Sequence, residues 1–113
     1  MNPLYQDKIN VYRYVEKEDP EFFTTVNGYK LILESINCDV QPYSSEKIEK
    51  QYGYKVETTK VIFIDIYPEI TEECIIEYNS QFYKIQKIIL WDKLLKHLEI
   101  AVIELKGDVD IIE

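Results

Sequence analysis

The residue types that perform chemistry in proteins are few in this chain, and their spacing matches no catalytic or metal-binding pattern. The single histidine, His97, has no nearby partner in sequence for general-base catalysis, so we interpret it as a strand-end or surface histidine. The chain has no glycine-rich phosphate loop, no zinc-ligand spacing and no EF-hand pattern. Its many carboxylates fall mainly in expected loops, where charged residues are usually solvated. We therefore expect no enzyme, no catalytic residue, no metal and no cofactor.

The two cysteines also suggest packing rather than chemistry. Cys38 and Cys74 are too few for a disulfide scaffold, and a zinc site would need more ligands. Each cysteine falls on the apolar face of an expected strand. We expect both to be buried free thiols that behave as small hydrophobic residues.

Length and composition are those of one folded domain over residues 1–113. With 46% hydrophobic residues the chain can bury a core, and it lacks the low hydrophobicity of disordered segments. We expect a soluble, cytoplasmic protein without membrane contact, because no signal peptide or membrane-length apolar run is present. The net charge of −8 argues against simple neutralisation of DNA phosphates, although it is compatible with a ring that DNA slides through.

Apolar residues recur mostly with a period of two, which indicates strands. We expect the first near 8–15, a loop or short turn over 16–27, and a hairpin turn at Asn27-Gly28. Further strands are expected at 29–41, 54–65, 73–78, 82–90 and 98–105, with a turn at Asn79-Ser80 and a flexible acidic tail over 106–113. Strands apolar on both faces, such as 61–64 and 88–90, lie either mid-sheet or against another subunit.

One short helix is expected between the second and third strands. Ser45 can cap its start, Glu46 suits its positive end, and Gly53 can close it. The pattern therefore predicts a mainly β fold: a small antiparallel β-barrel or sandwich of about six strands with one short helix.

Ten tyrosines are the unusual feature of the composition. Tyrosine combines a large contact area with a polar end, and aromatic residues are enriched at interfaces. Clusters near the first strand and near the short helix are candidates for contact with other subunits. The candidates for a subunit or partner interface are Tyr12, Tyr14, Phe22 and Phe23.

The order of these features resembles the head–tail joining, or head-closure (stopper), proteins of long-tailed bacteriophages. The likeness runs from about Val11 to Leu105. It rests on the strand end Val40-Gln41-Pro42, the helix start Ser44-Ser45-Glu46, the strand ending at Ile64-Asp65, the hairpin over 78–85 and the closing strand.

The resemblance implies a β-barrel that assembles into a ring beneath the portal and its adaptor. Such a ring closes the filled capsid, lets double-stranded DNA pass and docks the tail proteins. The protein would occupy the host bacterial cytoplasm during assembly and the virion head–tail interface afterwards. The resemblance also implies a channel or gating segment. Its residues would be Tyr43, Ser44, Ser45, Glu46, Lys47, Glu49, Lys50, Tyr52, Gly53 and Tyr54. The alternative is that the helix packs across a barrel opening.

Two other functions remain open at the level of sequence. A tail-terminator protein is similarly small and ring-forming, but it caps the tail tube. A small OB-like barrel that binds nucleic acid would require a basic face, which the acidic composition does not readily supply.

Overall fold

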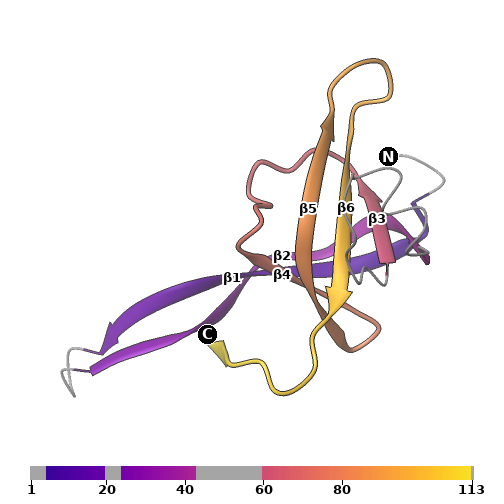
Figure 1. Cartoon of the computed structure of the whole chain (residues 1–113). Coiled ribbons are helices and arrows are strands. Elements are labelled where there is room, and N and C mark those ends of the chain that lie inside the picture. Colours follow the sequence, from indigo (N-terminus) through magenta and orange to yellow (C-terminus); the bar gives the residue numbers. More distant parts are fainter. Residues whose placement is uncertain (1–4, 20–23, 43–59, 113) are drawn as a thin grey trace.

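Six strands close an antiparallel barrel, and a short seventh strand is added beside it (Figure 1). The computed structural model describes residues 5–19, 24–42 and 60–112. The strands are β1 (Asp7–Asp19), β2 (Thr24–Pro42), β3 (Lys60–Ile64), β4 (Cys74–Tyr78), β5 (Gln81–Trp91), β6 (His97–Glu104) and β7 (Ile111–Ile112).

The barrel consists of two three-stranded meanders, β1–β2–β3 and β4–β5–β6. The pairing of β1 with β4 joins them on one side, and the pairing of β3 with β6 joins them on the other. Because the sheet closes on itself, each barrel strand pairs with two neighbours over part of its length. This result confirms a mainly β fold and the barrel alternative of the prediction.

The core fills the barrel with branched aliphatic side chains and the two thiols. Its fully buried members include Ile9, Val11, Cys38, Ile62, Ile64, Cys74, Ile76, Ile100 and Val102. These residues alternate along their strands, so the apolar residues with a period of two are the ones that face the barrel interior. Both cysteines are free and buried, as predicted.

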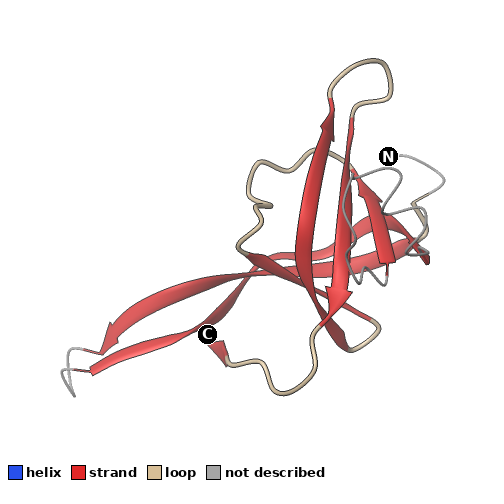
Figure 2. Ribbon diagram, viewed as in Figure 1, coloured by secondary structure: helices blue, strands red, loops and turns tan. Residues whose placement is uncertain are grey.

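No helix occurs among the described residues (Figure 2). The helix expected over 45–53 lies in residues 43–59, outside the described part of the chain, so this detail of the prediction is not borne out. The predicted hairpin between β4 and β5 is present. Its turn residues, Asn79 and Ser80, have φ of 51° and 63°, as in a type I′ turn.

The prediction for residues 16–27 is wrong in its described part. Residues 16–19 continue β1, residues 24–27 belong to β2, and Asn27-Gly28 is no hairpin turn. Gly28 pairs with Val15 inside the ladder. A Cβ there would lie 2.8 Å from the carbonyl oxygen of Asp110, so glycine allows the chain end to approach β2 closely.

That chain end forms β7, which sequence reasoning did not predict. β7 pairs with β2 in parallel, with Tyr29 opposite Ile111 and Lys30 opposite Ile112. The backbone N–H of Tyr29 also donates to the carbonyl oxygen of Asp110 at 2.7 Å. The expected acidic tail therefore includes a segment that is paired with the sheet.

Candidate functional site

A two-stranded ribbon projects from the barrel (Figure 1). We define the ribbon as residues 14–19 of β1 and 24–29 of β2. The pairing of β1 with β4 ends at Arg13, and the pairing of β2 with β3 covers only Cys38 to Pro42. In the ribbon the two strands pair with each other. At the ribbon base, β2 also pairs with β7. Beyond its base, the ribbon therefore pairs with no strand of the barrel.

A pair of tyrosines marks the base of this ribbon. Tyr14 and Tyr29 lie opposite each other, and their rings meet edge to face with centroids 5.3 Å apart. Tyr14 remains 47% exposed, and its place at an interface stays a prediction. Phe22 and Phe23, the other ribbon-proximal candidates, lie outside the described residues.

Tyr12 belongs to the barrel instead. Its side chain is buried, its hydroxyl donates to Oε1 of Glu77 at 3.1 Å, and its ring meets Phe82 edge to face. Burial raises the pKa of Tyr12, and the hydrogen bond and negative charge of Glu77 raise it further. Its role in the described structure is packing and hydrogen bonding within the barrel.

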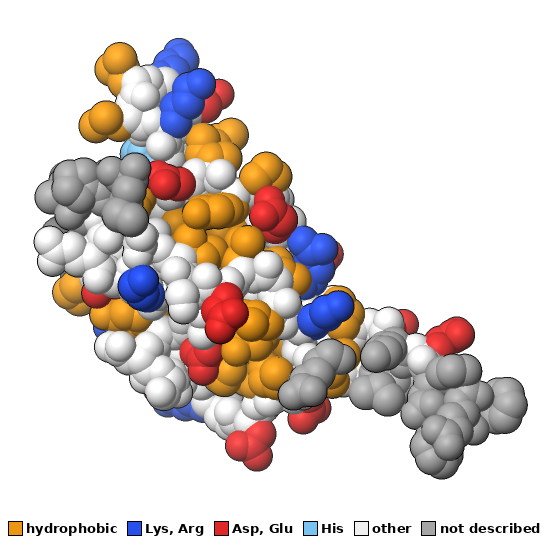
Figure 3. Space-filling view, turned by 180° about the vertical axis from the view of Figure 1, so that it is seen from behind, with side chains coloured by type: hydrophobic (Ala, Val, Ile, Leu, Met, Phe, Trp, Pro, Cys, Tyr) orange, Lys and Arg blue, Asp and Glu red, His pale blue; other side chains and the backbone are white. Residues whose placement is uncertain are grey.

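Residues 91–96 join β5 to β6, and we call this segment the tip. It carries the most exposed large hydrophobic side chains of the described residues. Leu94 is 98% exposed and Leu95 is 86% exposed. Lys93 and Lys96 flank these leucines, and both lysines are exposed. Hydrophobic and basic side chains accordingly lie together at the top of the space-filling view (Figure 3).

The base of the tip is held by aromatic contacts. The indole of Trp91 stacks on the ring of His97, with centroids 6.1 Å apart and planes 16° from parallel. Nδ1 of His97 donates to the carbonyl oxygen of Leu95 at 2.6 Å. These contacts fix the start and end of the tip while its two leucines point away from the core.

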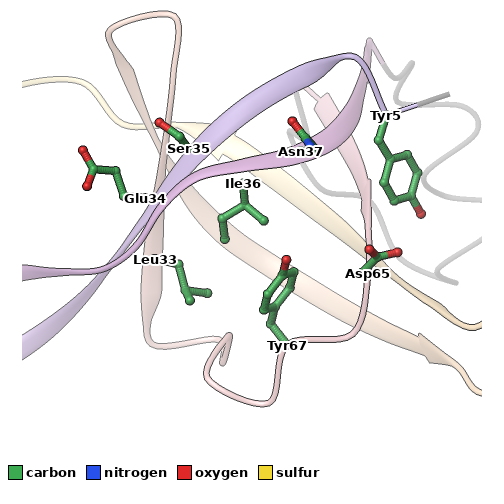
Figure 4. Close-up of a pocket in the computed structure, with 8 residues that line it drawn as sticks. All are labelled: Tyr5, Leu33, Glu34, Ser35, Ile36, Asn37, Asp65 and Tyr67. Atoms are coloured by element: carbon green, nitrogen blue, oxygen red, sulfur yellow. The ribbon is translucent and has the colours of Figure 1, made fainter. Parts of the chain in front are cut away.

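A hollow of about 480 Å³ opens between β2 and the segment that follows β3 (Figure 4). We call it the acidic hollow. Leu33 and Ile36 of β2 and the ring of Tyr67 supply the apolar part of its lining. Glu34 and Asp65 lie at opposite ends of the group. The remaining lining residues are Tyr5, Ser35 and Asn37.

No Lys or Arg side chain is among the described residues that line the acidic hollow. Within the described part of the chain, no ion pair engages Glu34 or Asp65. A second hollow, of about 400 Å³, adjoins it and is lined partly by Leu94, Leu95 and Lys96 of the tip. Tyr5 and Asp65 line both hollows. One end of the barrel therefore combines an apolar, basic projection with an apolar, acidic recess.

The expected channel segment cannot be placed relative to these features. All of its residues, from Tyr43 to Tyr54, lie outside the described residues. In the described ranges no group of three or more His, Cys, Asp and Glu residues could hold a metal ion. No described helix has the length and apolar character needed to cross a membrane.

Sequence reasoning did not identify the tip or the acidic hollow. A signal for the tip is present, because Leu94-Leu95 interrupts the alternation between two strands and lies between two lysines. Adjacent apolar residues in a hairpin loop cannot both face the core. No comparable signal marks the hollow, since its residues come from segments about thirty positions apart.

Comparison with known proteins supports the fold alone. No family model and no curated protein matches the chain. The solution structure of protein SF1141 from Shigella flexneri 2a is similar, with a TM-score of 0.75 and 18% sequence identity. The match covers 96% of this chain and 100% of that one.

Proposed function

We propose that this protein is a structural assembly protein, a head-closure subunit of a long-tailed bacteriophage. Subunits would form a ring that closes the DNA-filled capsid and docks the tail. Its partners would be portal-adaptor proteins, tail proteins and other copies of itself. Assembly would take place in the host cytoplasm and leave the ring at the head–tail interface of the virion.

The observation that carries this proposal is the ribbon. A two-stranded hairpin is marginally stable in water, and such a ribbon gains stability when another surface covers it. Apart from the contact of β7 at its base, the ribbon leaves the outer backbone edges of β1 and β2 without a partner from the barrel. Strand edges of this kind are a common route to association between subunits.

A contact between the ribbon and a different surface of the next copy would be heterologous. Repeated around an axis, heterologous contacts generate a closed ring. The net charge of −8 also suits a ring around DNA, because an acidic wall repels phosphates and keeps binding weak during passage. Residues 43–54 would supply the channel segment in this proposal.

The ribbon can be shortened without opening the barrel. Val15 and Gly28 are paired, so residues 16–27 can be replaced by an Asn-Gly turn, which favours a tight hairpin. We expect this variant to keep the barrel, with an unchanged far-ultraviolet circular dichroism spectrum of the β-sheet core. We also expect it to fail to complement a phage or prophage lacking the gene.

A conservative variant controls for general surface effects. Lys84 is exposed on β5 outside the ribbon, so Lys84→Ala should complement fully. Full plating efficiency with the shortened ribbon would contradict the proposal, because a ring without its subunit contact could not close the head.

A further inference from the structure

We propose that the tip of one copy docks in the acidic hollow of a neighbouring copy. The inference rests on the proposed ring, for which it identifies a specific contact between subunits. The occupant is a second copy of this chain, and the recognised group is its Lys-Leu-Leu-Lys sequence over residues 93–96.

The tip exposes two adjacent leucines. Leu94 and Leu95 are almost fully exposed, while most other aliphatic side chains of the described strands are at least partly buried. Removal of an aliphatic side chain from water is favourable. Two adjacent exposed leucines at a projecting hairpin therefore favour burial against another surface.

The tip and the acidic hollow are complementary in charge. The acidic hollow has Leu33, Ile36 and Tyr67 between two carboxylates, and the tip has two leucines between two lysines, with Asp92 next to Lys93. Each apolar centre thus meets an apolar centre, and each flanking charge meets its opposite. Opposite charges around an apolar contact direct association and set its orientation.

The tip and the acidic hollow are formed by different elements of the chain. The tip belongs to β5 and β6, whereas the acidic hollow belongs to β2 and the segment after β3. No tip residue lines the acidic hollow of its own chain. In the proposed ring each copy gives its tip to one neighbour and its acidic hollow to the other, which is the heterologous arrangement that can propagate around an axis.

Thiol cross-linking tests the contact directly. Cys38 and Cys74 are buried, so an introduced surface cysteine would be the reactive thiol among these positions. Leu94→Cys and Ser35→Cys introduce thiols at the tip and in the hollow. At millimolar protein concentration under oxidising conditions, we expect a mixture of the two single variants to form a disulfide-linked heterodimer.

A matched mixture supplies the control. Lys106 is exposed and lines neither hollow, so Leu94→Cys mixed with Lys106→Cys should give at least tenfold less heterodimer. Equal yields in the two mixtures would overturn the proposal. The double variant Leu94→Cys/Ser35→Cys should form a ladder of oligomers, and a product that stops at the dimer would contradict the head-to-tail arrangement.

Charge exchange gives an independent measurement. Lys93→Glu/Lys96→Glu should weaken self-association at least tenfold in sedimentation velocity. Combination with a partner carrying Glu34→Lys/Asp65→Lys should restore association. Lys84→Glu/Lys106→Glu makes the same change in net charge away from the tip and should leave association unchanged. Absence of rescue, or an equal loss with the control variant, would overturn the contact.

The contact and the proposed function can fail separately. If the tip variants do not cross-link but the shortened ribbon still abolishes head closure, the docking contact is wrong and the assembly function stands. If the contact forms and the gene is dispensable for virions, the assembly function is wrong. Binding of the tip to anionic lipid vesicles without cross-linking would also overturn the contact.

Discussion

The carbonyl oxygen of Asp110 lies so close to Gly28 that a Cβ on this glycine would come within 2.8 Å of it. The same oxygen accepts a hydrogen bond from the N–H of Tyr29. The close approach attaches β7 to the base of the ribbon, at the point where the ribbon leaves the barrel. Any larger residue at position 28 would have to move β7.

Gly28→Ala should therefore release β7 from β2. The Cβ would also contact Cγ2 of Ile112 at 2.7 Å, but that methyl can move more easily than the backbone of Asp110. We expect a loss of stability of about 1–3 kcal/mol, as is typical of overpacking. Faster amide hydrogen exchange at Tyr29 would identify the site, and unchanged protection there would contradict this explanation.

Tyr14 and Tyr12 should separate assembly from stability. Tyr14 is half exposed on the ribbon, so Tyr14→Ala should lower stability by no more than about 1 kcal/mol but impair virion assembly. Tyr12 is buried, so Tyr12→Ala should cost about 3 kcal/mol or more. Urea unfolding and plating efficiency measure the two effects. A Tyr14 variant that assembles normally would remove this residue from the interface.

Asp7 joins the start of β1 to two other strands. Oδ2 accepts from the backbone N–H of Val40 at 2.9 Å, and Oδ1 accepts from the hydroxyl of Tyr78 at 3.3 Å. Desolvation raises the pKa of Tyr78, and the negative charge of Asp7 raises it further. Asp7→Asn keeps an acceptor but removes the charge, so it should lower the pKa of Tyr78 in an NMR titration. An unchanged Tyr78 pKa would rule out this electrostatic coupling.

Cys38 should make the protein less stable at alkaline pH. Burial raises the pKa of its thiol from 9.0 to about 12, with smaller contributions from the charges of Asp7 and Asp39. The folded state therefore favours the neutral thiol. This stabilisation is complete below pH 9 and is lost as the pH rises towards 12, because the unfolded thiol ionises first.

The Cys38→Ala variant isolates this contribution. Between pH 9 and 12 the wild-type stability should fall more steeply than that of the variant, by up to about 1.4 kcal/mol per pH unit. Cys74→Ala removes another buried sulfur and controls for lost volume. Parallel stability curves for wild type and Cys38→Ala across this range would contradict the assignment.

The strands that surround the core could be predicted from sequence because one face of each is apolar. The turn at Asn79-Ser80 could be predicted because both residues tolerate positive φ. In contrast, the sequence predicts a loop over 16–27, whose described residues belong to the ribbon. Glu16, Glu18 and their neighbours in sequence show no apolar alternation.

Register and burial at single positions were less predictable. Strict alternation from Ile85 places Ile89 on the inward face, but a bulge between Ile85 and Lys87 changes the alternation of β5, so Ile88 packs against the core. Tyr12, a candidate interface residue, donates its hydroxyl hydrogen bond to Glu77, which lies 65 residues further along the chain. Such distant partners have no local signal in the sequence. The channel segment over 43–54 stays a prediction.

Electron microscopy of lysates from a phage or prophage lacking this gene tests the central claim most directly. The proposed head-closure function predicts finished tails beside capsids that have lost their DNA. DNA-filled heads with overlong tails would contradict it in favour of a tail terminator, and normal virions would contradict any role in virion assembly.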